Sequence, residues 1–298
     1  MNAKVPILIT AFNRPESLRR SLEALSDYSN PIYIWIDGPR SGNPADQNSV
    51  SLTETVARRS DANIQGIYKS EINLGLRFSV SNAISWVFEN YESAIILEDD
   101  ILIDSNFMSF AEQALDYYKD IPQIGSIAAY SPTPVELRNS LSHDAYFSVY
   151  TESWGWATWK NRWQEFEGMD LESFRFNDCL PPTSKNLFAK YSWTRVLKKI
   201  KTGKLSSWAY LWMFTSWSHN WLTVVPKKNL SSNFGSGASA THTSTVEFRE
   251  IEPLSNLPIK FPDHIEQNLV LDRWVALNVF SLSFRKALIN LVGSLRNF

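Results

Sequence analysis

The sequence predicts an α/β fold in which a mostly parallel sheet is flanked by helices. Short apolar, β-branched segments alternate with segments whose apolar residues recur at helical spacing through the first hundred residues. Polar or acidic residues follow the apolar segments at their carboxyl ends. Strands that alternate with helices form parallel sheets covered on both faces, and such sheets bind ligands at the carboxyl ends of their strands.

The expected elements alternate along the first half of the chain. Strands are expected at residues 5–12, 32–37, 63–70 and 94–97, and helices at residues 15–28, 52–60 and 78–91. The first helix carries Pro15 in its first turn, where proline is tolerated, and Leu18, Leu22 and Leu25 on one face. The segment GPRSGNPAD, which follows the second strand, is typical of a turn.

Composition and charge exclude several classes of protein. The chain has 298 residues, enough for one large domain or two modest ones, and its formal net charge of -2 gives no basic footprint for duplex nucleic acid. The single cysteine, Cys179, cannot form an intramolecular disulfide, and the amino terminus lacks the features of a secretory signal. No run of about twenty uncharged apolar residues predicts a transmembrane helix. We therefore expect a cytoplasmic protein that does not bind nucleic acid.

Three consecutive acids, Glu98, Asp99 and Asp100, follow the fourth expected strand. Adjacent carboxylates repel one another unless a cation lies among them. Their oxygens suit a hard divalent cation, which often leaves coordination positions open for substrate phosphates. A solvated strand end explains acids equally well, so the residues alone leave both interpretations open.

Tryptophan is concentrated in the middle of the chain. Nine of the 12 tryptophans lie between residues 154 and 221. The segment SWGWATWKNRW places Trp156, Trp159 and Trp163 at i, i+3 and i+7, which predicts a helix that buries one face. Core packing is the favoured interpretation for Trp159 and Trp163.

Several segments occur together in an order typical of a known family. They are ITAFNRP, IWIDGP, NLGLR, IILEDDILID followed by NFMSFAEQAL, and SWGWATWKNRW. With these segments the chain resembles the GT-A fold glycosyltransferases, and among them bacterial sugar transferases related to N-acetylglucosaminyltransferase I. The resemblance runs from about Val5 to about His242. It implies a GT-A (Rossmann-like) sheet, a nucleotide-sugar donor and a divalent metal, Mn2+ or Mg2+.

The resemblance implies roles for the acids and for one histidine. Asp100 would bind the metal, while Glu98 and Asp99 would face the ribose and the donor sugar. Many GT-A enzymes complete the metal site with a C-terminal histidine, and His242 lies at the matching end of the core. A neutral imidazole is a sound ligand for Mn2+, although a lone loop histidine is more often solvated.

Four further residues match positions that contact the nucleotide in that family. Asp37 matches the acid that helps to hold the base, and Asn13 and Arg14 match the turn beneath the nucleotide. Arg77 lies where such enzymes contact the nucleotide or its phosphates, and a solvated arginine at a helix start is the alternative.

The acceptor site and the catalytic base are expected in the tryptophan-rich half. Trp154 and Trp156 flank Gly155, in the loop that approaches donor and acceptor in the resembled family, and aromatic faces pack against sugar rings. Those relatives have an aspartate near a segment that here reads LSSWAYLW and contains no acid. Glu152 is the preferred substitute as base, and Asp178 is the second choice.

The resemblance also divides the chain. Residues 1–245 would form the GT-A domain, with a nucleotide-binding half at 1–130 and an acceptor half at 131–245. Residues 246–298 would form a strap and an amphipathic helix packed on that domain. The expected helix, at 266–297, carries interleaved basic residues: Arg273, Arg285, Lys286 and Arg296. Such a helix packs on the core, packs on a second subunit, or lies on the inner face of an anionic membrane.

The expected function is metal-dependent transfer of a sugar from a nucleotide-diphosphate sugar, preferably a UDP-sugar, to a saccharide or lipid-linked saccharide acceptor. The product would be a surface polysaccharide, and the enzyme would be a hexosyl- or N-acetylhexosaminyltransferase that inverts the anomeric centre. One alternative is a catalytically inactive GT-A-like protein that binds a sugar or a nucleotide sugar. A nucleotidyltransferase is less favoured, because AFNRPES lacks the glycine-rich, basic phosphate loop after the first strand.

Overall fold

The computed structural model describes residues 4–176, 179–235, 250–252, 254 and 258–282. Within these residues the strands are β1 Ile7–Ala11, β2 Ile32–Ile36, β3 Ile64–Lys69, β4 Ser93–Glu98, β5 Ile101–Ile103, β6 Ile124–Ala128, β7 Ala145–Ser148, β8 Trp156–Trp159, β9 Leu222–Pro226 and β10 Ser231–Asn233. The helices are α1 Pro15–Ala24, α2 Pro44–Arg59, α3 Gly75–Phe88, α4 Ser105–Tyr118, α5 Val135–Arg138, α6 Lys160–Glu167, the 3-10 helix Pro182–Ser184, α7 Leu187–Lys201, α8 Trp208–Ser218 and α9 Leu269–Asn278.

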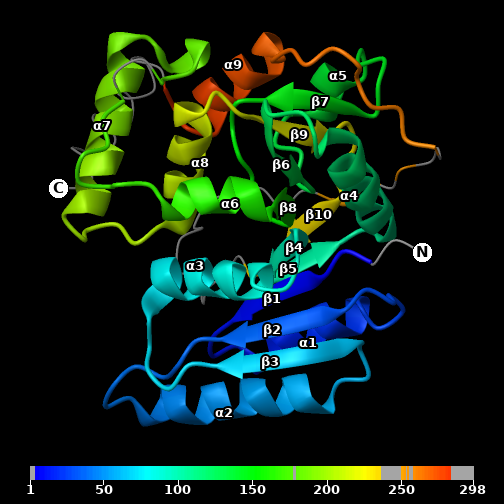
Figure 1. The fold of residues 1–298 in the computed structure, drawn as a ribbon, viewed down its shortest axis with the longest axis vertical. Helices are drawn as coiled ribbons and strands as arrows, with labels where there is room; N and C mark the ends of the chain where they lie inside the picture. The colour runs from blue at the N-terminus through cyan, green and yellow to red at the C-terminus, as the bar shows by residue number, and fades with distance from the viewer. Residues whose placement is uncertain (1–3, 177–178, 236–249, 253, 255–257, 283–298) are drawn as a thin grey trace, which may run out of the picture.

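An eight-stranded sheet with the order β3-β2-β1-β4-β8-β6-β9-β7 forms the centre of the molecule (Figure 1). Its first four strands are parallel, β8 runs antiparallel to both of its neighbours, and β7 closes the far edge antiparallel to β9. Strands β5 and β10 form a separate two-stranded sheet. The predicted α/β class with a mostly parallel, helix-flanked sheet is confirmed.

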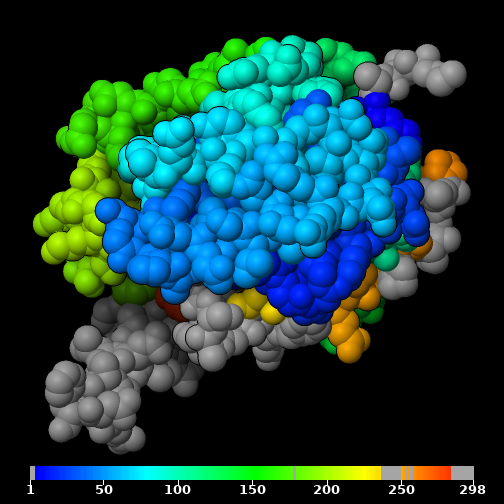
Figure 2. All heavy atoms as spheres, turned by 90° about the horizontal axis from the view of Figure 1, so that it is seen from below, coloured from blue at the N-terminus to red at the C-terminus, as the bar shows by residue number. Residues whose placement is uncertain are grey.

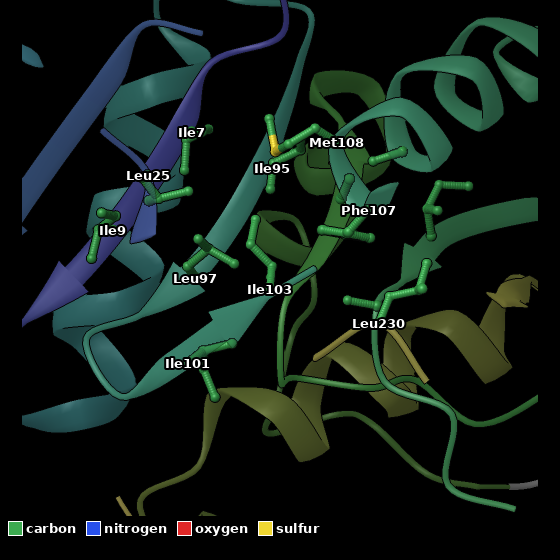
Figure 3. Close-up of a cluster of buried hydrophobic side chains, with 14 of the residues drawn as sticks. Ile7, Ile9, Leu25, Ile95, Leu97, Ile101, Ile103, Phe107, Met108 and Leu230 are labelled. Atoms are coloured by element: carbon green, nitrogen blue, oxygen red, sulfur yellow. The ribbon is translucent and has the colours of Figure 1, made fainter. Parts of the chain in front are cut away.

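Helices cover both faces of the parallel part of the sheet. Ile7 and Ile9 of β1 pack with the leucines of α1 and with α4, while Leu8 packs on the opposite face with α3 and the tryptophans. Because successive side chains of a strand point to opposite faces, a strand covered on both sides is apolar at every position. Figure 3 shows the first of these clusters, in which Phe107 and Met108 of α4 face β1 and β4.

Helix α2 begins earlier than the sequence predicts. It starts at Pro44 instead of residue 52, because Asn43 accepts a hydrogen bond from the backbone N–H of Asp46 and caps the first turn. Pro44 occupies the first helical position, where its missing N–H costs nothing. The interpretation of the whole GPRSGNPAD segment as a turn is therefore wrong for its last three residues.

The helical interpretation of the tryptophan block is also wrong for its first part. Trp156 and Trp159 lie in strand β8, and α6 begins only at Lys160. Trp156 lies between Ile96 of β4 and Ala128 of β6, so it occupies an interior strand of the sheet. A strand places these two rings on opposite faces, and their helical spacing to Trp163 is a coincidence.

The described part of the C-terminal region runs over the domain surface. Glu252 pairs with the buried Arg138 at 2.6 Å, and Phe261 packs on the aromatic residues of α4. Helix α9 covers the first part of the helix expected at 266–297, and residues 283–298 lie outside the described residues. Among the residues that the structure describes, no helix is both long and apolar enough to cross a membrane.

Asp272→Asn tests the anchor of α9. The Asp272 carboxylate is buried and accepts hydrogen bonds from Ser148 Oγ, the Val149 N–H and Gln267 Nε2. Burial raises the pKa of Asp272 to about 6, while its three donors oppose that rise. A raised folded-state pKa gives stability that is present below pH 4 and is lost as the pH rises through 6. The free energy of unfolding of the wild type, minus that of the variant, should therefore fall by roughly 3 kcal/mol between pH 4 and pH 7.

Urea unfolding at several pH values measures this difference. The asparagine oxygen can accept from Val149 and Gln267 while its amide donates to Ser148, so the variant should fold. The exposed Asp61→Asn serves as the control. A pH-independent difference for Asp272→Asn would show that the carboxyl is ionised in the folded protein.

Candidate functional site

A cleft of about 660 Å³ opens at the carboxyl ends of β1, β2 and β4, beside the start of α3. It is lined by the following residues: Thr10, Ala11, Phe12, Asn13, Arg14, Asp37, Arg40, Asn73, Gly75, Leu76, Ser79, Val80, Glu98 and Asp99. Asn13, Arg14, Asp37, Glu98 and Asp99 were selected from the sequence, and the fold brings all five to this one cleft.

Asp37 holds the loop that leads into α3. Its carboxylate accepts hydrogen bonds from the N–H groups of Gly38, Leu74 and Gly75 at 2.9–3.1 Å and from Asn73 Nδ2 at 3.0 Å. Burial raises the pKa of Asp37, and the three backbone donors oppose that rise. Since both oxygens already accept two hydrogen bonds, the observed role of Asp37 is to shape the cleft wall.

Asn13 ties the end of β1 to the start of α2. Its Nδ2 donates to Asp46 at 2.8 Å, and Asp46 also accepts hydrogen bonds from Arg40. The Arg40 guanidinium lowers the pKa of Asp46 to about 2. Arg40 in turn lies over the Phe12 ring, with 5.5 Å between the guanidinium carbon and the ring centroid. This rim of the cleft is thus cross-linked through polar contacts.

The Arg14 guanidinium is the cation among the three acids. It forms ion pairs with Asp99 and with Asp100, the second at 2.6 Å between Nη1 and Oδ2. Asp99 is 1% exposed and Asp100 is 6% exposed, whereas the Arg14 side chain is 30% exposed. One guanidinium that bridges two buried carboxylates offsets part of their repulsion.

Burial, together with the neighbouring carboxylates, raises the pKa values of two acids. Burial raises the pKa of Glu98 to about 8, with further increases from Asp100 and Asp99. Burial likewise raises the pKa of Asp99 to about 7, although Arg14 opposes that shift. A hydrogen bond from the Trp208 side chain lowers the pKa of Glu98 and connects the first turn of α8 to the cleft. The acids therefore still favour additional positive charge.

Asp100 keeps one oxygen unpartnered. Its Oδ1 is buried and makes no hydrogen bond with any residue that the structure describes. The acid is held in place because Leu97 before it and Ile101 after it point into the core (Figure 3). Gly235 lies directly over the carboxylate, and a Cβ at that position would lie 2.7 Å from Asp100 Cγ.

The chemistry of these donors fits a hard divalent cation in part. An orphaned carboxylate oxygen next to acids with raised pKa values is a suitable ligand for Mn2+ or Mg2+. The described residues contain no group of three or more metal-ligating side chains placed to hold an ion. His242, the expected second ligand, lies outside the described residues, as does Asp178.

Arg77 lies beside the cleft. Leu76 and Ser79 of the same helical turn line it, while the Arg77 guanidinium packs over the Phe78 ring at 5.1 Å. Burial lowers the pKa of Arg77, and no acid contributes to that shift. Its charge is therefore not committed to an ion pair with a described residue.

The loop before β8 approaches the same end of the sheet. Gly155 has a φ of 80°, and a Cβ there would lie 3.1 Å from Ala129 Cβ, so both the backbone angle and the space favour glycine. The Trp154 ring packs on Tyr130 with a centroid distance of 4.6 Å. Trp156 is 1% exposed and stacks on Trp208, so its ring forms part of the core and offers no free face.

Glu152 lies in the acceptor half. It is close enough to the Tyr146 hydroxyl to contribute to the raised pKa of that tyrosine, for which burial is the larger cause. Tyr146 also contacts Thr133 in the loop after β6. In the segment that lacks an acid, the Ser207 side chain caps α8 by accepting a hydrogen bond from the Tyr210 N–H at 3.3 Å.

Sequence reasoning missed three features of this site. It placed Arg14 beneath the nucleotide and did not identify it as the counterion of Asp99 and Asp100, which lie more than 80 residues away. It also missed Trp208 as the donor to Glu98 and Gly235 as the residue above Asp100. The only sequence feature that indicated these ion pairs was the position of Arg14 directly after the first strand.

Neither a protein-family model nor a curated protein sequence matches the chain. Solved structures are similar to it at low sequence identity. The mannosyltransferase PcManGT from Pyrobaculum calidifontis, in complex with GDP-Man and Mn2+, is 13% identical with a TM-score of 0.39, and the similarity covers 73% of each chain. Mouse xyloside xylosyltransferase 1 is 10% identical with a TM-score of 0.37, covering 71% of this chain and 81% of that one. HddC from Yersinia pseudotuberculosis, complexed with GMP-PN, is 11% identical with a TM-score of 0.32, covering 59% of this chain and 86% of that one. The relationship to N-acetylglucosaminyltransferase I stays a prediction.

Proposed function

We propose that this protein transfers a sugar from a nucleotide-diphosphate sugar, preferably a UDP-sugar, to a saccharide or lipid-linked saccharide acceptor. The observation that carries the proposal is the carboxylate cluster in which Glu98 and Asp99 line a 660 Å³ cleft and the adjacent Asp100 keeps a buried, unpartnered oxygen. A cleft at the carboxyl ends of parallel strands is where α/β folds bind nucleotides. The proposal includes a hexosyl or N-acetylhexosaminyl group, inversion at the anomeric carbon, and a product that is a surface polysaccharide.

The donor would lie in the cleft between the loop after β1 and the start of α3. Asn13 and Arg14 would contact the nucleotide from below, and Asp37 would fix the loop beside the base. Arg77 has a free charge that would reach the phosphates. Glu98 and Asp99 would face the ribose and the donor sugar.

Asp100 and His242 would hold Mn2+ or Mg2+. Such an ion supplies positive charge that stabilises the departing nucleoside diphosphate. The buried, orphaned Asp100 Oδ1 supports this part of the proposal. Arg14 would offset the repulsion between the Asp99 and Asp100 carboxylates when no metal ion is bound.

The acceptor half would begin at residue 131 and end at residue 245, with residues 246–298 packed on the domain. Trp154 and Gly155 would contact the acceptor, and Trp156 would support that loop from the core. The C-terminal helix would contact either a second subunit or the inner face of a membrane, and the enzyme would be cytoplasmic.

A thermal-stability screen tests the donor proposal. The melting temperature would be measured with nucleoside diphosphates and nucleotide sugars, each with Mn2+, with Mg2+ and with EDTA. A ligand at 100 times its Kd adds about 2.7 kcal/mol to the free energy of unfolding, which raises the melting temperature by several degrees. We expect a metal-dependent rise for one nucleotide sugar. A panel without any rise would contradict the proposed donor.

An inactive sugar-binding protein is the second candidate function. It is favoured by the absence of an acid at Ser206, Ser207 and Ala209, where the resembled family has its catalytic aspartate. Release of nucleoside diphosphate in the presence of an acceptor separates the two candidates. A protein that binds the donor and never releases nucleoside diphosphate would be the binding module.

Glu152→Gln tests the proposed base. Removal of a general base typically costs 10²–10⁴-fold in turnover, so we expect a loss of at least about 100-fold with donor binding retained. Turnover is measured as nucleoside diphosphate release, and donor binding as the shift in melting temperature. Glu136→Gln, an exposed substitution on α5 in the same half, should leave both values unchanged. Near-normal turnover in Glu152→Gln would move the base to another carboxylate, with Asp178 as the next variant.

A further inference from the structure

Helix α7 presents a face on which cations alternate with exposed apolar side chains. Leu187 is 87% exposed and Tyr191 is 59% exposed, in the first turn and a half of the helix. Lys190, Arg195 and Lys198 are exposed, and each lies three or four residues from Leu187, Tyr191 or Arg195, which places them on the same side. The Arg195 guanidinium packs over the Tyr191 ring at 5.7 Å.

The opposite face of α7 is firmly anchored. Ala189, Trp193, Leu197 and Ile200 are buried in a cluster that also contains residues of α8 and α9. The Trp193 ring lies 5.1 Å from that of Phe280, just after α9. The basic face is therefore held in a fixed orientation on the domain, and it can meet a partner without refolding.

This part of the chain is free of acids. Between residues 179 and 246 the sequence has no Asp or Glu, although it has nine Lys and Arg residues, in a chain whose net charge is -2. The lysines on the exposed face of α7 form no ion pair with a described acid. At the far end of the helix, burial lowers the pKa of Lys201, and Glu172 and Asp170 oppose that shift. Positive charge is thus concentrated in this segment, in a chain whose overall charge is slightly negative.

We propose that this face of α7, including Lys185, Lys199 and Lys204 near its ends, docks on an anionic lipid bilayer. Charge complementarity selects an anionic partner, and the exposed leucine and tyrosine suit the boundary between headgroups and acyl chains. A nucleic acid would use the cations and leave Leu187 without a role. The proposal does not depend on the identity of the donor or on the occurrence of transfer.

The docking face is connected to the cleft. Residues 202–207 join α7 directly to Trp208, whose side chain donates a hydrogen bond to Glu98. Figure 1 shows α7 on the side of the molecule toward which β1, β2 and β3 point with their carboxyl ends. In Figure 2, which shows the face formed by the first half of the chain, the α7 segment again lies at one end of the molecule. A bilayer at α7 would therefore lie on the cleft side of the domain.

Vesicle co-sedimentation with the full chain tests the proposal. Vesicles of phosphatidylcholine mixed with phosphatidylglycerol serve as the anionic surface, and vesicles of pure phosphatidylcholine as the neutral one. We expect binding to the anionic vesicles only, weakened at high salt. The variant Lys190→Gln, Lys198→Gln, Lys199→Gln should lose on the order of 100-fold in partition coefficient, since each surface cation contributes about fivefold. Leu187→Ser should weaken binding with an unchanged salt dependence.

A charge-matched control separates this face from general electrostatics. Arg58→Gln, Lys119→Gln, Lys160→Gln removes three cations that pair with Glu54, Asp116 and Glu92 on other surfaces. Unchanged binding in this control, with loss in the α7 variant, supports the proposal. Equal losses in the two variants, full binding by the α7 variant, or binding to heparin or RNA without binding to anionic vesicles would each overturn it. Circular-dichroism melting confirms that both variants fold.

Discussion

If the protein has the proposed function, Asp100→Asn should abolish metal-dependent binding of the nucleotide sugar while leaving the fold intact. Asparagine has nearly the shape of aspartate, but its neutral amide is a poor ligand for Mn2+ or Mg2+. Loss of residues that only support metal ligands already costs 10–100-fold in affinity, so loss of a direct ligand should cost at least about 100-fold. In the thermal screen, the stabilisation by the donor with metal should disappear, and the melting temperature without ligand should change little.

The unliganded protein provides a second readout. The substitution removes one of the two carboxylates that Arg14 bridges and one of the charges that raise the pKa of Glu98. The pKa of Glu98 should therefore fall, although it should stay raised because burial, the largest cause of the rise, is unchanged. Asp116→Asn, an exposed change on α4, is the matched control and should retain normal binding. Metal-dependent donor binding that survives Asp100→Asn would show that the ion, if bound, is held elsewhere.

The parallel half of the fold could be predicted because its strands are apolar throughout. A strand such as β1, which is buried on both faces, has only apolar or small residues from Ile7 to Ala11, and a helix with leucines at helical spacing follows at once. Local sequence is sufficient for this pattern. It was insufficient at β8, where two bulky rings on opposite faces of a strand happen to lie three residues apart.

The gathering of several candidate residues at one cleft could also be predicted, since parallel strands bring their carboxyl ends to one edge. The contacts within it could not. The side chains of Arg14 and Asp99 meet because β1 and β4 are neighbours in the sheet, and strand order is not written in either segment. Trp208 reaches Glu98 because the antiparallel β8 lies beside β4 and carries Trp156, on which Trp208 stacks. Such contacts depend on the order of the strands, which sequence periodicity leaves open.

Arg14→Gln should be the most destabilising substitution in the cleft. It leaves the buried carboxylates of Asp99 and Asp100 without their described counterion, and breaking a buried pair typically costs 3–5 kcal/mol. Because the Arg14 side chain is 30% exposed, we expect the lower end, about 3 kcal/mol at pH 8. Urea unfolding in the presence of EDTA measures the loss.

The loss should depend on pH with a defined sign. Burial already raises the pKa of Asp99 to about 7 against the opposing effect of Arg14, so removal of the arginine raises that pKa further. A folded-state pKa above the unfolded value gives stability that is present at low pH and is lost as the pH rises through the folded pKa. The deficit of Arg14→Gln should therefore be small near pH 5 and grow through pH 7 to 9. Arg19→Gln, an exposed change one turn further along α1, should show little change at any pH.

A divalent cation should reverse part of this loss. If the acids form a cation site that the guanidinium shares, millimolar Mg2+ or Mn2+ should stabilise Arg14→Gln more than the wild type, because the ion then meets two uncompensated carboxylates. The difference should vanish in the double variant Arg14→Gln, Asp100→Asn. If the loss of unfolding free energy in Arg14→Gln depends on neither pH nor divalent cations, Arg14 acts by packing alone and the acids do not form a site for cations.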